Sequence, residues 1–193
     1  LFLGLSGLSS VFTPDQLGWM LNIKGTGVSA IILGFLIGIV VTALLHSSSA
    51  FSAIVITMAY NGLISWELAA AMTLGSNVGS TVDSIMASMG TSANGRRAAL
   101  IHVMFNLFGT IVVLCFLKPF LDLVMFITPG QENSNIAIRI SMLHTVFNII
   151  TTVVMTPLSG KLVKIAEFLI KDDPSEKKKV FKLEFIEHSG KEN

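Results

Sequence analysis

The chain has 193 residues, of which 52% are hydrophobic and 13% charged, and its formal net charge is +1. A soluble domain carries about 25% charged residues, so this composition excludes an ordinary soluble domain and indicates an integral membrane protein. Residues 161–193 hold 15 of the 25 charged side chains, which predicts a membrane body followed by a polar tail.

Residues 1–24 are predicted to form a truncated helix and an interfacial segment. Residues 1–13 are apolar but too short to span a bilayer, and the more polar residues 14–24 contain Trp19. The chain does not begin with Met, and its start lacks a signal-peptide pattern. We therefore interpret it as a piece of a longer protein. The single cysteine, Cys115, indicates neither an internal disulfide nor a thiolate metal site.

Residues 25–62 form an apolar block without any Asp, Glu, Lys or Arg. As one helix this block would be roughly 57 Å long, against a hydrocarbon core of about 30 Å. The sequence His-Ser-Ser-Ser-Ala at residues 46–50 is the natural break, because buried hydroxyls need partners and compete with helical hydrogen bonds. We therefore predict a re-entrant hairpin with arms of about 25–45 and 50–62 and with the serines at its tip.

The next apolar segment, residues 63–89, contains the sequence Gly-Ser-Asn-Val-Gly-Ser-Thr at residues 75–81. Two glycines and four polar residues within seven positions weaken a helix. This pattern predicts a broken transmembrane helix. In many transporters, interrupted helices at membrane depth form the ion or substrate site.

Residues 98–117 and 136–156 are long and apolar enough to span, and residues 158–171 are predicted to form an amphipathic interfacial helix. Two crossings separate the basic pair at residues 96–97 from the lysine-rich tail, so both basic segments should lie on one side. The excess of positive charge predicts that this side is cytoplasmic. The chain is then a multi-pass protein of the cell (inner) membrane with a cytoplasmic C-terminus.

The two predicted spanning helices share an internal repeat, because His-x-x-Phe-Asn occurs at residues 102–106 and again at residues 144–148. Together with the two polar interruptions, and in this order, these motifs resemble the type II sodium-dependent phosphate cotransporter family over about residues 25–160. The resemblance implies the C-terminal repeat of a bacterial member, and thus an all-α integral membrane fold that is one repeat of an inverted-repeat architecture. The domains would be residues 1–24, the transmembrane repeat at 25–160, and an amphipathic helix with a polar cytoplasmic tail at 161–193.

The resemblance also implies a site for inorganic phosphate and sodium between the two interruptions. The expected phosphate-binding residues are Ser47, Ser48, Ser49, Asn77, Ser80 and Thr81. The expected sodium-binding residues are His46, Ser47, Ser49, Asn77, Thr81 and Asp83. No catalytic residue is expected, Na⁺ is the only expected metal, and there is no organic cofactor. The expected partners are the missing N-terminal repeat and the lipid bilayer, with a PhoU-like soluble region or a homodimer as further candidates, and no nucleic acid.

This sequence differs from the family pattern at two positions of the expected site. His46 replaces a glutamine; a neutral histidine can donate and accept a hydrogen bond as an amide does, but a histidine can also become protonated near neutral pH. Asp83 replaces a threonine-type residue, and a carboxylate beside a cation site can alter sodium binding. Both differences leave the substrate anion and the sodium stoichiometry open.

Three other functions remain as alternatives. The chain could belong to a sodium-coupled carrier of another anion, such as a dicarboxylate or sulfate, or to a phosphate-sensing module that does not transport. Serines and histidines in membrane segments also raise an intramembrane serine hydrolase. This last alternative is disfavoured because the Gly-x-Ser-x-Gly nucleophile motif is absent. The buried-polar residues could also serve packing alone, with serines bonded to carbonyls within their own helix.

Overall fold

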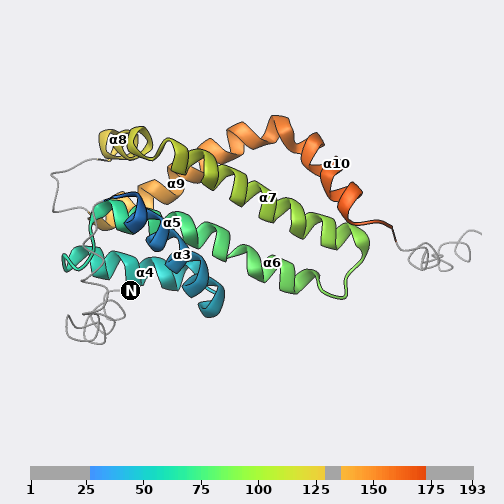
Figure 1. The fold of residues 1–193 in the computed structure, drawn as a ribbon, viewed down its shortest axis with the longest axis horizontal. Coiled ribbons are helices and arrows are strands. Elements are labelled where there is room, and N and C mark those ends of the chain that lie inside the picture. Colours follow the sequence, from blue (N-terminus) through green and yellow to red (C-terminus); the bar gives the residue numbers. More distant parts are fainter. Residues whose placement is uncertain (1–26, 129–135, 173–193) are drawn as a thin grey trace, which may run out of the picture.

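A computed structural model describes residues 27–128 and 136–172, and within these ranges every regular element is a helix. Figure 1 shows the helices as a bundle in which α5, α6 and α7 form its long axis. The predicted elements of residues 1–24 and of the tail beyond residue 172 lie outside the described ranges. The helices are α3 (Val28–Leu45), α4 (Ser48–Tyr60), α5 (Trp66–Gly79), α6 (Thr81–Ser88), α7 (Ala93–Cys115), α8 (Leu117–Ile127), α9 (Ile136–Met155), the 3₁₀ turn η1 (Thr156–Leu158) and α10 (Ser159–Leu169).

Three helical stretches are long and apolar enough to cross a membrane, namely Val28–Leu45, Ala93–Cys115 and Ile136–Leu169. The first two agree with predicted membrane segments. The third runs beyond the predicted end near residue 156, because Pro157 lies in η1 and the chain continues directly into α10. A proline is tolerated at the start of a helical turn, where its missing N–H would have no partner.

The predicted break in residues 25–62 is confirmed, and it falls at His46 and Ser47. His46 ends α3 in the left-handed conformation, with φ 51° and ψ 29°. Ser47 is the N-cap of α4, and its hydroxyl accepts a hydrogen bond from the Ala50 N–H at 3.2 Å. The break thus precedes most of the serine run, and Ser48 and Ser49 begin α4. The re-entrant hairpin that these two helices were expected to form remains a prediction.

The second interruption is smaller than its sequence suggests. Residues 75–79 are helical and belong to α5, and only Ser80 separates α5 from α6. The Ser80 N–H still donates to the Ser76 carbonyl, so the helical hydrogen bonding continues across the junction. The hydroxyls of Ser80 and Thr81 donate to carbonyls three residues earlier. The interruption is therefore limited to one residue, and the serine and threonine hydroxyls bond to carbonyls of the preceding turn.

Helices α3 and α5 run side by side in the same direction and approach very closely. Gly34 faces Leu68, Gly38 faces Met72 and Gly75, and Gly79 faces Ile39 and Thr42. A Cβ atom added to Gly38 would lie 2.1 Å from the Met72 carbonyl oxygen. Small residues at a spacing of four let two membrane helices bring their backbones together. This contact fixes the hairpin against α5.

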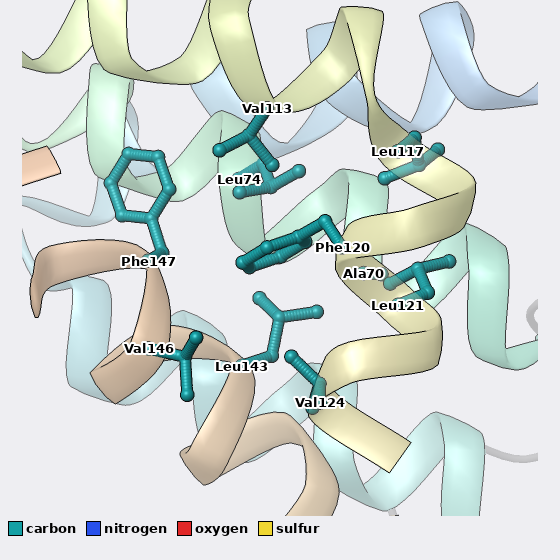
Figure 2. Packing of buried hydrophobic residues seen from close by; sticks show 10 residues of the cluster. All are labelled: Ala70, Leu74, Val113, Leu117, Phe120, Leu121, Val124, Leu143, Val146 and Phe147. Atoms are coloured by element: carbon teal, nitrogen blue, oxygen red, sulfur yellow. The ribbon is translucent and has the colours of Figure 1, made fainter. Parts of the chain in front are cut away.

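Helix α8 is an element that the sequence analysis did not predict. It follows α7 after one residue and contains Pro119 in its first turn, where proline fits a helix. Its apolar face packs between α5, α7 and α9, as Figure 2 shows. This cluster is centred on Phe120 and Phe147, together with Ala70, Leu74, Val113, Leu117, Leu121, Val124, Leu143 and Val146.

Arg97 connects the start of α7 to the end of α10. Its Nε and Nη2 atoms donate to the Ile170 carbonyl at 3.0 and 2.9 Å, and Nη2 lies 2.8 Å from Asp172 Oδ1. The basic pair and the beginning of the tail therefore lie at one end of the bundle (Figure 1). This arrangement fits the predicted placement of both on one side of the membrane.

Candidate functional site

The hairpin turn meets helix α6 through a polar contact between its histidine and the aspartate. His46 Nδ1 lies 2.5 Å from Asp83 Oδ1, and the two side chains are 49% and 46% exposed. The geometry requires a shared hydrogen, because two bare acceptors would repel each other at this distance. The two residues that differ from the family pattern are therefore in direct contact with each other, and the side chains of both are partly exposed to solvent.

The serine run lies at the N-terminus of α4. Ser47 and Ser49 place their hydroxyl oxygens 3.2 Å apart, and Ser47 caps the helix. The first N–H groups of a helix have no partner within it, and the helix dipole makes this end positive. A helix start with adjacent hydroxyls is a suitable environment for an oxyanion.

Buried polar groups occur on both α3 and α5, and one of them, Thr42, lies against Gly79 of α5. Thr42 is fully buried, and Ser76 and Asn77 are 2% and 5% exposed. Within the described chain, no hydrogen-bond partner is found for Thr42 Oγ1, Ser76 Oγ or Asn77 Nδ2. Buried polar atoms without partners are costly and rare. Three of them lie on α3 and α5, the two helices that lead to the polar interruptions, so these atoms can form hydrogen bonds with a ligand or with another part of the protein.

The structure brings some of the predicted site residues together. His46 and Asp83 are in contact, and Thr42 lies against Gly79, one residue before Ser80. Asn77, Ser80 and Thr81 lie at the junction of α5 and α6. The expected cavity between Ser47–Ser49 and these three residues remains a prediction.

The structure adds two residues, Thr42 and Ser76, to the candidate site. Thr42 was not predicted, although its spacing of four from Gly38 places it on the glycine face of α3. Ser76 lies in the predicted motif but was not assigned to the site. In both cases the signal is burial of a hydroxyl without a partner in the described chain, which depends on tertiary packing that the sequence does not show.

The repeated His-x-x-Phe-Asn motif has the same local geometry in both helices. The side-chain amides of Asn106 and Asn148 donate to the carbonyls of His102 and His144, at 3.1 and 2.8 Å. These two bonds stay within each helix. His102 does bond between helices, because its Nδ1 lies 2.7 Å from Ser84 Oγ.

The Ser84–His102 contact bears on the hydrolase alternative, since the sequence spacing gave no reason to expect a serine–histidine pair. A triad needs a carboxylate on the other ring nitrogen to orient the histidine. No such carboxylate bonds to His102 within the described ranges, where Asp83, adjacent to Ser84, contacts His46 instead. The adjacent α6 residues Asp83 and Ser84 thus contact His46 and His102, respectively. These two contacts hold α6 between the α3–α4 turn and α7.

These features define a helical membrane protein with a polar site built at a helix break. Comparison with known proteins gives the family: the Na⁺/Pi-cotransporter family matches residues 1–151, and the chain belongs to it.

Three relatives illustrate the range of this similarity. The chain is 31% identical to the uncharacterized protein YqeW of Bacillus subtilis over 135 residues, which is 70% of this chain and 42% of YqeW. It is 27% identical to the candidate inorganic phosphate export protein YjbB of Salmonella typhimurium, over 75% of this chain and 26% of YjbB. It is 33% identical to the rat sodium-dependent phosphate transport protein 2B, over 66% of this chain and 18% of that protein. The chain therefore spans less than half the length of these relatives. No solved structure matches the chain significantly.

Proposed function

We propose that this chain is part of a sodium-coupled transporter of inorganic phosphate and supplies about half of its substrate and ion site. Membership of the family and the name of the rat relative support phosphate transport with sodium. The observation that carries the site is the set of buried, unpartnered polar atoms on α3 and α5, together with the contact between His46 and Asp83. The other half of the site would come from a second repeat of the same transporter.

The chemistry of the turn suits an anion and a cation together. Phosphate accepts hydrogen bonds, and we assign it to the N-terminus of α4 and to Ser47, Ser48 and Ser49, facing Asn77, Ser80 and Thr81. The Ser80 and Thr81 hydroxyls donate to the carbonyls of Asn77 and Val78 in this structure, and would turn toward the phosphate when it binds. Sodium prefers oxygen ligands. We assign it to hydroxyl and amide oxygens of Ser47, Ser49, Asn77 and Thr81 and to the Asp83 carboxylate, with His46 holding that carboxylate.

Charge gives the physical reason for coupling. No lysine or arginine belongs to the proposed site, so a phosphate dianion needs its charge offset by other means. Helix N-termini supply about half of an elementary charge each, and sodium supplies the rest. The ion would be a counter-charge as well as the source of energy. Transport would follow from movement of one repeat against the other around this site.

Sodium-dependent uptake of ³²P-labelled phosphate into vesicles containing the full-length protein tests this proposal. We expect uptake to require an inward sodium gradient and to be competed by unlabelled phosphate, but not by sulfate or succinate. Competition by sulfate or succinate would favour the carrier of another anion. Binding without uptake in either direction would favour the phosphate-sensing module. Loading the vesicles and measuring efflux determines the direction, since one relative is named for export.

A buried threonine offers a sharper test of the site. Thr42→Val keeps the shape of the side chain and removes a hydroxyl that has no partner within the described chain. If Thr42 serves only packing, this variant should be as stable as the parent or more stable, and sodium dependence should not change. If Thr42 contributes to the ion site, the sodium concentration for half-maximal uptake should rise at least threefold.

Thr110→Val is the matched control for this variant. Thr110 is also fully buried, and its hydroxyl likewise has no partner within the described chain, but it lies on α7, where its neighbour Gly109 faces Thr151 of α9. We expect Thr110→Val to leave the sodium dependence unchanged. An equal effect of both substitutions on half-maximal sodium would contradict a specific role for Thr42.

A further inference from the structure

A second polar feature lies at the other end of the bundle from Arg97. A cavity of about 990 Å³ opens between α3, the α4–α5 connection, the end of α7, α8 and the start of α9. Its wall is mixed. Leu114, Leu117, Leu121 and Met125 are apolar, while Glu67, Lys118, Asp122 and Arg139 are charged. None of these residues belongs to the proposed transport site.

Arg139 is the unusual residue of this cavity. It is only 7% exposed, and its side chain makes no ion pair or hydrogen bond to any residue in the described ranges. A guanidinium remains charged in proteins, and burying an unpaired charge is costly. Buried charges are normally paired. The Arg139 guanidinium nitrogens are not among the fully buried atoms without partners, so they reach the open cavity, where an anion can contact them.

The other charged residues do not provide the missing partner. Lys118 and Asp122 pair with each other, with Nζ and Oδ2 3.1 Å apart. Glu67 lies in the first turn of α5, and its carboxylate is more than 4 Å from the Arg139 guanidinium, since no salt bridge joins them. A buried donor without a partner lies on the same wall: the indole N–H of Trp66 lacks an acceptor within the described chain.

We propose that this cavity binds a phosphate group through Arg139, at a site separate from the transport site. A guanidinium presents parallel N–H donors that fit two oxygens of a phosphate group. The group could be free inorganic phosphate or the headgroup of a phospholipid whose acyl chains lie along the apolar wall. This inference does not rest on the proposed transport function, because none of the residues that line this cavity belongs to the proposed transport site.

The test measures binding to the purified full-length protein in sodium-free potassium buffer, where the proposed transport site should not hold phosphate. One arm uses ³²P-labelled orthophosphate in equilibrium dialysis. The other uses native mass spectrometry to measure retained phosphatidylglycerol and phosphatidylethanolamine. Arg139→Gln should weaken binding of at least one probe by tenfold or more, whereas the control Arg96→Gln, at the other end of α7, should change nothing.

Arg139→Lys keeps the charge but loses the paired N–H donors, so we expect a threefold or larger loss of binding. This variant keeps the test valid if Arg139→Gln does not fold.

Glu67→Gln distinguishes free phosphate from a phospholipid headgroup. Removing this negative charge should strengthen the binding of free phosphate and of phosphatidylglycerol. It should weaken the binding of phosphatidylethanolamine, because the ammonium group of that lipid would lose a partner. If Arg139→Lys and Glu67→Gln bind all three probes as the parent does, the proposal is wrong. Equal losses with Arg96→Gln would also overturn it, since they would show general charge attraction.

Discussion

Replacing Gly38 or Gly75 with alanine is expected to destabilise the protein severely, although each change adds only one methyl group. The added Cβ would lie 2.1 Å from the Met72 carbonyl oxygen in the first variant and 2.1 Å from the Phe35 carbonyl oxygen in the second. Cβ atoms do not approach other atoms below 3.0 Å. Because the obstacles are backbone atoms, no side-chain rotation relieves the clash, and α3 and α5 must separate.

The cost should reach or exceed the upper end of the overpacking range of about 1–3 kcal/mol, since the whole helix pair has to move. The measurement is the temperature at which half of the detergent-solubilised protein is lost from the monodisperse peak in size-exclusion chromatography. Gly160→Ala is the matched control, because a Cβ at this position of α10 meets nothing within 4 Å. Equal thermal stability of Gly38→Ala, Gly75→Ala and the parent would show that α3 and α5 do not pack this closely.

The same substitutions should also impair transport in the fraction that folds. Thr42 lies on the glycine face of α3, and the hairpin turn follows four residues later. Separation of α3 from α5 would move Thr42 away from Gly79 and His46 away from Asp83. Close packing of small residues is therefore the physical link between the sequence of α3 and the position of the candidate site.

A feature of this fold could be predicted from the sequence when the residues that determine it lie within one segment of the chain. The hairpin break followed from length alone, because residues 25–62 exceed one crossing, and a polar run marked the position. The interruption after Gly75 was overestimated. Propensity disfavours glycine and serine in a helix, but here the glycines make the close contact with α3, and that packing outweighs the propensity.

The remaining differences concern contacts between distant segments. Helix α8 was not predicted from the sequence; it begins at Leu117, where the predicted spanning helix 98–117 ends, and Pro119 lies in its first turn. The contact between His46 and Asp83 joins residues 37 positions apart, and no sequence period relates them. Arg139 also looked unremarkable in sequence, since its significance arises from burial in a cavity whose walls come from several helices.

Asp83→Asn is expected to give the largest functional loss of any conservative change at the candidate site. The substitution keeps the size of the side chain and removes one negative charge from a position that we assign to sodium. A carboxylate within about 4 Å of a cation contributes roughly 4 kcal/mol at an effective dielectric constant of 20, and solvent at this half-exposed position reduces that considerably. We expect the sodium concentration for half-maximal phosphate uptake to rise at least tenfold. The control Glu167→Gln removes an exposed carboxylate from α10 and should have no effect.

The role of His46 follows from the same experiment carried out as a double-mutant cycle. A neutral histidine can donate its Nδ1 proton to the Asp83 carboxylate, and a glutamine amide can do the same. His46→Gln should therefore retain sodium-dependent uptake, whereas His46→Ala should weaken sodium binding by leaving the carboxylate without its donor. If His46 acts through Asp83, adding His46→Ala to Asp83→Asn should cause little further loss, because the group that His46 positions is already changed. Fully additive losses in half-maximal sodium would show that the two residues act independently, and the contact between them would then serve only to hold the hairpin against α6.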